Sequence, residues 1–170
     1  LAQTGARISC KRAEYVARLV GKTQEIFDGI SSGRDSIGLR YSCSYLIPES
    51  VNDTVEALRK LLETHRASDL AQGCTNSGAH RDDLHISVNG MVARSYASQG
   101  QKRSCVLALK LAEASLLEES AGERPIAVLD DVMSELDGLR QDYLLNHMDG
   151  WQVFISCCDP HTVKGLDRGR

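Results

Sequence analysis

The segment that most constrains the fold is an apolar run at residues 126–129 that ends in two adjacent carboxylates, Asp130 and Asp131. A short apolar run bounded by turn residues is consistent with a buried strand. A carboxylate at the end of such a strand is costly if it is buried without a partner, and here two follow in succession. The pair predicts either a bound cation or a solvent-exposed acidic turn, and these two residues alone favour neither.

The residues after the carboxylates extend the pattern to a helix and a second strand. Ser134 and Asp137 have the spacing of a helix N-cap, and a helical apolar pattern covers about residues 136–148. Residues 153–155 then predict a final buried strand. Because the connections are short, strand, helix and strand together predict a parallel α/β unit.

A second turn opens the most apolar helix of the chain, expected at about residues 101–119. It reads, in order, Ser98, Gln99, Gly100, Gln101, Lys102 and Arg103. A serine hydroxyl, a glycine amide and a helix amino end together form an anion site, whereas simple capping of the helix by Ser98 is the better interpretation of this turn by itself. Apolar residues cover much of the helix circumference, so we expect the helix to be buried.

The order of these signals favours a nucleotide site over three unrelated structural features. A phosphate-binding turn comes first, a helix separates it from the acidic strand end, and a further acidic segment follows. We expect Asp130 to hold Mg²⁺, through water, and Asp131 to polarise the attacking water. The same order and spacing match the second half of an ABC-type ATPase head.

The amino-terminal residues predict one long helix and no phosphate loop. Residues 5–30 carry apolar side chains in steps of three and four, and the helix is expected to end in the Ser-Ser-Gly cluster at 31–33. Residues 21–23, Gly-Lys-Thr, imitate the end of a P-loop. That pattern requires glycine at position 16, where this chain has Val16, so we reject it.

The middle of the chain predicts a strand, a second helix and a hairpin. Alternating side chains over residues 36–45 predict a half-buried strand. Asp53 and Glu56 have capping-box spacing for a helix that fades by about Ala71. Residues 83–96 predict a β-hairpin with Asn-Gly at its turn, because both turn positions favour positive φ. The organisation predicts two parts, a mainly helical arm with one strand (1–78) and an α/β lobe (79–170).

Composition excludes several classes of protein. The chain has 170 residues, of which 42% are hydrophobic and 25% charged, as in soluble globular domains. A net charge of −3 and a pI of about 6.0 argue against a large basic surface for nucleic acid, although a local patch stays open. No apolar run approaches the roughly 18–20 residues that span a bilayer. The first residues do not resemble a signal peptide, so we expect a cytoplasmic, non-membrane protein. The six cysteines form no C-x-x-C pair, so we expect them to be reduced thiols.

Several segments of the carboxyl-terminal part carry a family resemblance. They are GAHRDDL (78–84), Asn89-Gly90, YASQGQKR (96–103), KLAE (110–113) and PIAVLDDVMSELD (125–137). Together they resemble the C-terminal half of the RecF family, bacterial recombination-mediator ATPases related to SMC proteins. The resemblance is strong over residues 78–158 and looser before them. Two details are specific to it: SQGQ replaces the LSGGQ of ABC transporters, and Asp-Asp replaces their Asp-Glu.

The resemblance implies a role for each residue of the two turns. Residues 98–101 correspond to the signature motif, which contacts the γ-phosphate of ATP bound on the other protomer. Asp130 corresponds to the Walker B carboxylate that holds Mg²⁺, Asp131 to the catalytic acid, and residues 134–137 to the D-loop. The implied nucleotide-binding residues are Ser98, Gln99, Gly100, Gln101, Arg103, Ser134 and Asp137.

The resemblance also implies partners. RecF-like proteins form homodimers around two ATP molecules, bind double-stranded DNA and single-strand/double-strand junctions at gaps, and act with RecR and RecO to load RecA. One departure concerns ABC heads in general, which usually carry a γ-phosphate-sensing histidine after the last strand. Residues 155–158 here read Ile-Ser-Cys-Cys, so the resemblance assigns no sensor.

The expected fold class is α/β, the C-terminal lobe of an ABC-type (P-loop NTPase) ATPase head with a mainly helical arm. A first residue other than Met suggests a piece of a longer protein whose P-loop precedes this chain, so we expect negligible ATP hydrolysis by these residues alone. Two alternatives stay open. One is a non-catalytic DNA- or partner-binding module that uses Arg12, Arg18 and Lys22. The other is the head of another SMC-like protein, which the absence of a long heptad run disfavours.

Overall fold

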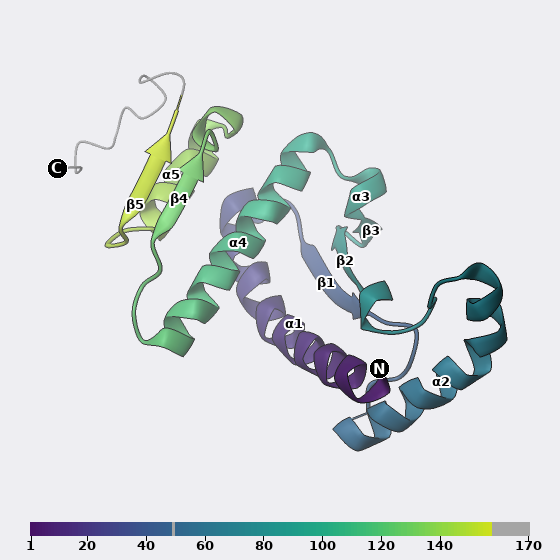
Figure 1. Ribbon diagram of the computed structural model, residues 1–170. Coiled ribbons are helices and arrows are strands. Elements are labelled where there is room, and N and C mark those ends of the chain that lie inside the picture. The colour runs from purple at the N-terminus through teal and green to yellow at the C-terminus, as the bar shows by residue number, and fades with distance from the viewer. Residues whose placement is uncertain (49, 158–170) are drawn as a thin grey trace.

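The computed structural model describes residues 1–48 and 50–157 (Figure 1). In chain order its elements are α1 (Ala2–Ser31), β1 (Ile37–Ser42), α2 (Val51–Gln72), the 3₁₀ turn η1 (Ala79–Arg81), β2 (Asp83–Val88), β3 (Met91–Val92), α3 (Ala93–Tyr96), α4 (Gln99–Ala121), β4 (Ala127–Asp130), the 3₁₀ turn η2 (Met133–Glu135), α5 (Gly138–His147) and β5 (Val153–Ser156). Helices α1 and α4 lie at the centre, with the β1-β2-β3 sheet toward one side and the β4-α5-β5 unit toward the other (Figure 1).

The long helix predicted at the amino terminus is confirmed as α1. Its buried stripe includes Leu19, Thr23, Phe27 and Ile30, in the steps of three and four that the sequence predicted. The helix ends at Ser32, whose left-handed backbone lets its amide bond the carbonyls of the last turn. Helix α1 packs against α2, α4, α5 and β1, so it is the central helix around which these elements are arranged.

The predicted capping of the second helix is wrong. Ser50 is the N-cap of α2, and Asp53 lies inside the first turn, where its negative charge favours the helix amino end. Helix α2 rests on α1 through Leu58, which is 1% exposed. A Cβ on Gly5 of α1 would lie 2.8 Å from the Leu58 side chain, so the glycine permits the close approach of the two helices.

Strands β1, β2 and β3 form an antiparallel sheet in which Ile37 pairs with Val88 and Ser87 with Val92. The predicted turn is confirmed, since Asn89 and Gly90 both have positive φ. The return strand is much shorter than predicted. After two residues the chain leaves the sheet, because Ala93 turns into the core and begins the helical turn α3.

The first strand is also shorter than the alternation indicated. It ends at Ser42, and the chain beyond it turns toward α1, where the Tyr45 hydroxyl donates to Ser9 Oγ at 2.6 Å. A side-chain hydrogen bond to the helix has replaced continued pairing in the sheet.

The predicted parallel unit is confirmed, and β4 pairs with β5 from Ala127 opposite Val153 to Asp130 opposite Ser156. Helix α5 covers one face of this pair (Figure 1), and its Leu144 and the next residue after the helix, Met148, are buried in the core. The prediction that both strands are buried is wrong for the other face, where Val128 is 73% exposed and Phe154 is 56% exposed. Among the described residues no second layer covers that face, so the alternate side chains stay open to solvent.

The prediction of a wholly buried central helix is likewise only partly right. Leu107, Leu111 and Leu116 of α4 are buried, but Val106 and Leu117 are more than half exposed. A single cluster of buried residues joins α1, α4 and α5, while the predicted division into an arm (1–78) and a lobe (79–170) stays a prediction. Within the described ranges, no helix has the length and hydropathy needed to cross a membrane.

Candidate functional site

The turn at the start of α4 forms a complete capping box. Ser98 Oγ accepts from the Gln101 amide at 3.2 Å, and Gln101 Oε1 accepts from the Ser98 amide at 3.0 Å. Capping, the simpler of the two interpretations, is therefore present. It does not exclude anion binding, because the Ser98 hydroxyl donates to no acceptor in the described part of the chain. The amides of Gln99 and Gly100 lie in the first helical turn and have no partner within the helix.

Asp35 fixes this turn against the rest of the molecule. Its Oδ1 accepts from Gln101 Nε2 at 3.1 Å and from Asn89 Nδ2 at 2.7 Å, so one carboxylate joins the α4 turn to the hairpin. Together with burial, which is the larger effect, the charge of Asp35 raises the pKa of the nearby Cys105 thiol to about 11. The sequence analysis missed Asp35, because only the tertiary structure brings residue 35 to residue 101.

The two carboxylates lie at the carboxyl ends of β4 and β5. Ser156 Oγ donates to Asp130 Oδ1, and the Asp131 amide donates to the carbonyl oxygen of Ser156 at 3.2 Å and to its hydroxyl at 3.1 Å. Both aspartate side chains are exposed, so the burial cost considered from sequence does not arise. Ser156, which the sequence analysis did not single out as a site residue, orients the first carboxylate.

Asp131 has an unusual backbone. Its φ of 52° is in the left-handed region, which non-glycine residues rarely adopt and which clusters at functional sites. Ser134 stabilises this conformation, because its hydroxyl lies 2.9 Å from both the carbonyl oxygen and Oδ1 of Asp131. The prediction that Ser134 also caps α5 is wrong. Asp137 is the N-cap and accepts from the Arg140 amide at 3.0 Å.

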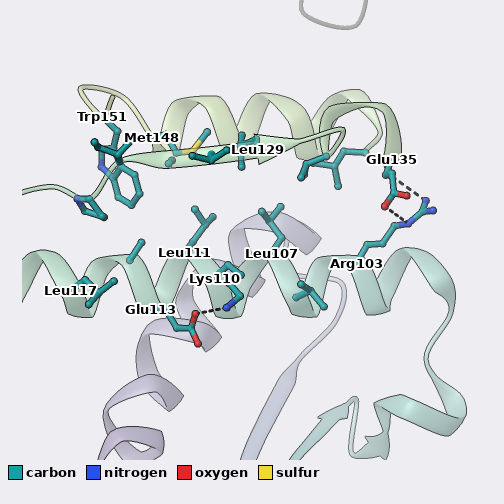
Figure 2. Close-up of a pocket in the computed structure, with 18 of the residues that line it drawn as sticks. Arg103, Leu107, Lys110, Leu111, Glu113, Leu117, Leu129, Glu135, Met148 and Trp151 are labelled. Carbon is teal, nitrogen blue, oxygen red and sulfur yellow. Dashed lines mark hydrogen bonds and ion pairs between the residues drawn. The ribbon is translucent and has the colours of Figure 1, made fainter. Parts of the chain in front are cut away.

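The segment 134–137 is tied directly to the turn at 98–103. Arg103 Nε lies 3.2 Å from Glu135 Oε2, and Arg103 Nη1 donates to the Glu135 carbonyl oxygen at 3.2 Å (Figure 2). The structure thus brings together the two turns that the sequence placed more than one helix apart. No hydrogen bond or ion pair between described residues joins Asp130 or Asp131 to residues 98–101.

Asp130 by itself fits the requirements of Mg²⁺. In the described ranges there is no cluster of three or more His, Cys, Asp or Glu side chains able to hold a metal ion. Mg²⁺ in nucleotide sites is commonly bound by one or two carboxylates, waters and substrate phosphates rather than by a protein cage. An exposed carboxylate at a strand end is therefore sufficient as the protein's share of such a site.

A groove of 580 Å³ separates α4 from the β4-α5-β5 unit (Figure 2). Apolar side chains line it, among them Leu107, Leu111, Leu117, Leu129 and Trp151. Figure 2 shows Leu107 and Leu111 of α4 pointing toward Leu129 of β4 across the groove. The Arg103–Glu135 pair lies at one end.

No protein-family model matches the chain, but individual relatives do. It is 39% identical over 172 residues to the DNA replication and repair protein RecF of Heliobacterium modesticaldum, covering 100% of this chain and 46% of that protein. RecF of Geobacter sulfurreducens is 39% identical over 172 residues, covering 98% and 47% respectively. RecF of Bacillus subtilis is 37% identical over 170 residues, covering 98% and 45%.

The chain belongs to the RecF family. Solved RecF structures also share its fold. The recombination mediator protein RecF-ATPrS of the RecFOR pathway superposes with a TM-score of 0.83 at 37% identity, over 94% of this chain and 43% of that one. RecF-ATP of the same pathway gives 0.81 at 39% identity, over 91% and 43%. The predicted fold class is confirmed, and this RecF-family chain spans a little under half the length of the relatives it matches.

The comparisons do not test the roles of individual site residues, which stay predictions. The turn at 98–101 and the segment 134–137 are called the signature turn and the D-loop from here on, after the features that the sequence resemblance predicts for them. No γ-phosphate sensor could be assigned in residues 155–158. Cys157 is described by the structure, and Cys158 lies outside the described residues.

Proposed function

We propose that this chain forms the signature, Walker B and D-loop part of a cytoplasmic RecF-type ATPase. The complete protein would dimerise around ATP, bind double-stranded DNA and gap junctions, and act with RecR and RecO to promote RecA loading. The relatives are DNA replication and repair proteins, and the solved relatives include RecF with ATP, which supports this proposal. The observation that carries it is the direct link between the D-loop and the start of α4, two residues after the signature turn, through Arg103 and Glu135.

In the proposed reaction, the signature turn binds the γ-phosphate of the ATP molecule that the partner protomer holds. The Ser98 hydroxyl donates to a phosphate oxygen, and the amides of Gln99 and Gly100 add two further donors. Their positions are fixed before ATP arrives, because the capping box and Asp35 already hold the turn.

At the acidic edge, Asp130 and Asp131 have separate tasks. Asp130, oriented by Ser156, would hold Mg²⁺ through water, and the ion when bound would neutralise developing charge on the phosphates. Asp131 accepts a hydrogen bond from the attacking water and draws off its proton. Ser134, which donates to Asp131, holds that carboxylate in position.

We further propose that the groove between α4 and β4 receives the P-loop-bearing part of the protein. These 170 residues contain no G-x-x-x-x-G-K-[ST] sequence, and the relatives are more than twice as long as this chain. The apolar lining and the exposed face of β4 suit a packed layer more than solvent. The chain alone should therefore hydrolyse ATP negligibly, and single-turnover hydrolysis by the isolated chain would contradict the proposal.

The decisive experiment uses a hybrid protein in which this chain replaces the matched segment of Bacillus subtilis RecF. We expect ATP, but not ADP, to convert the hybrid from monomer to dimer in sedimentation velocity, with slow hydrolysis that Asp131→Asn abolishes. Leu46→Lys, a change at an exposed arm residue, is the matched control. A hybrid that folds but neither dimerises nor hydrolyses ATP would overturn the proposal.

The alternative of a non-catalytic DNA-binding arm stays a prediction, and the structure gives its three cations partners within the chain. Lys22 and Arg18 both pair with Glu119 of α4, at 2.5 Å and 3.6 Å, and Arg12 donates to the Ala79 carbonyl oxygen at 2.6 Å. Because these partners already engage the three cations, we favour the ATPase proposal over a DNA contact through them. Helix α1 is 30 residues long and packs within the molecule, unlike the arm of a long coiled-coil SMC protein.

A further inference from the structure

Arg140 occupies an electrostatically unfavourable position. It lies in the first turn of α5, at the helix end that carries partial positive charge, where a cation is disfavoured. Asp137 offsets this in part, since its Oδ2 lies 2.5 Å from Arg140 Nη1. A side chain selected only to stabilise α5 would be acidic or neutral at this position.

The guanidinium of Arg140 also keeps unused hydrogen-bonding capacity. Only 21% of the side chain is exposed, and Nε is buried without a hydrogen-bond partner among the described residues. A buried donor that lacks an acceptor destabilises the fold, so its retention calls for an explanation.

The same guanidinium lies against the signature turn. A Cβ on Gly100 would be 3.7 Å from Arg140 Nη1 and 3.8 Å from Nη2, an ordinary contact distance. The cation is therefore beside Gly100, two residues after the Ser98 whose hydroxyl the proposed function assigns to phosphate. Asp137 is the one carboxylate paired with Arg140 in the described part of the chain.

Arg140 is not needed to hold the D-loop in place. Gln141 Nε2 donates to the carbonyl oxygens of Met133 and Leu136, at 2.8 Å and 3.1 Å, and Arg103 holds Glu135 from α4. These contacts hold Met133, Glu135 and Leu136 without the Arg140 side chain.

We infer that Arg140 is a γ-phosphate ligand of the composite ATP site, an inference that rests on the proposed function. With ATP bound on the partner protomer, the guanidinium donates to the phosphate alongside Ser98 and Gly100. A planar guanidinium suits phosphate because its N–H groups can donate in parallel. Without ATP, Asp137 acts as the substitute anion. Asp137 belongs to the D-loop. When Arg140 exchanges this carboxylate for phosphate, ATP binding therefore changes a contact of the D-loop.

The test uses Arg140→Gln and Arg140→Lys in the hybrid protein defined above. The matched control is Arg59→Gln on α2, because Arg59 pairs with Glu56 three residues earlier, as Arg140 pairs with Asp137. Three quantities are measured: the affinities for ATP and for ADP, ATP-dependent dimerisation, and kcat.

Arg140→Gln should weaken ATP-driven dimerisation and lower kcat by roughly 100-fold, the usual effect of losing one donor to a developing charge. ADP binding should be unchanged, because ADP has no γ-phosphate. Arg140→Lys should recover part of the loss, since it keeps the charge without the planar fork. Arg59→Gln should behave as the unsubstituted hybrid.

The outcomes separate the inference from the proposed function. Arg140→Gln with ATP-driven dimerisation and kcat intact would overturn the inference alone. Equal weakening of ATP and ADP binding, accompanied by a lower Tm, would also overturn it, because Arg140 would then be only structural. An unsubstituted hybrid that folds but does not respond to ATP would overturn the proposed function and this inference with it.

Discussion

The Ser156 hydroxyl donates to the Asp130 carboxylate across the β4–β5 pair, at the carboxyl ends of both strands. The same hydroxyl accepts from the Asp131 amide at 3.1 Å. One serine on the last strand therefore sets both the rotamer of the proposed Mg²⁺ ligand and the backbone of the proposed catalytic acid. Strand β5 thus contributes to the site as well as to the sheet.

This relationship predicts the effect of Ser156→Ala. In the hybrid protein the substitution should raise the Mg²⁺ concentration needed for half-maximal hydrolysis about 10-fold or more, because hydrogen-bond partners of metal ligands commonly contribute that much to metal affinity. A Mg²⁺ titration of the hydrolysis rate measures it. Ser115→Ala, which removes a hydroxyl bonded to the Leu111 carbonyl oxygen in mid-helix α4, is the control. Equal Mg²⁺ dependence in the two variants would refute the role of Ser156.

Much of the fold could be predicted because local pattern and tertiary packing agree. Steps of three and four predicted α1, the Asn-Gly pair predicted the hairpin turn, and the short connections predicted the parallel β4-α5-β5 unit. The predicted site residues also lie in two groups, one formed by the signature turn and the D-loop and the other by the two aspartates at the strand ends. The hydrogen bond from Ser134 to Asp131 joins the two groups.

What the sequence could not predict depends on contacts between distant residues. Asp35 bonds Gln101, Ser156 bonds Asp130, and Arg140 lies on Gly100, and no spacing rule links the members of these pairs. Exposure was mispredicted for a related reason. A continuous apolar run predicts that β4 is buried, but it does not show whether these residues supply the layer that covers Val128.

The groove gives a prediction that separates folding from assembly. Val128→Lys should leave the unfolding free energy of the isolated chain within about 0.5 kcal/mol, as for other surface substitutions, because Val128 is 73% exposed. In the hybrid protein the same charge would be buried beneath the P-loop-bearing part and should lower Tm sharply. Thermal unfolding of both proteins tests this. A similar, small change in Tm in both would show that the face of β4 stays open in the complete protein.

The core of the β4-α5-β5 unit makes a stability prediction that needs only the isolated chain. Leu144 of α5 is 0% exposed, and Leu144→Ala should lower the unfolding free energy by about 2–5 kcal/mol through lost burial and the cavity left behind. Leu139→Ala on the same helix, at 69% exposure, should cost far less. Urea denaturation of both variants makes the comparison. Comparable losses would mean that α5 is not packed as described.

His147 predicts how stability depends on pH. Burial lowers its pKa below the ordinary value of 6.5, and the charge of Glu25 on α1 opposes that shift only in part. The ring is half-buried and stacks on Tyr143, with centroids 5.7 Å apart. The folded chain therefore binds fewer protons than the unfolded chain near this pH. The contribution of neutral His147 to stability is complete above the unfolded pKa and is lost as pH falls through it toward the lowered folded pKa.

Replacing His147 should therefore flatten the acid side of the stability profile. Between about pH 7 and about pH 5, the unfolding free energy of His147→Gln should fall less than that of the unsubstituted chain, because the titrating group with the lowered pKa is gone. The exposed residue His85 on β2 supplies the control, His85→Gln. Urea titrations at several pH values give the slopes. Because carboxylates contribute equally to all three chains, only a difference in slope between His147→Gln and the other two supports the assignment, and parallel slopes would exclude it.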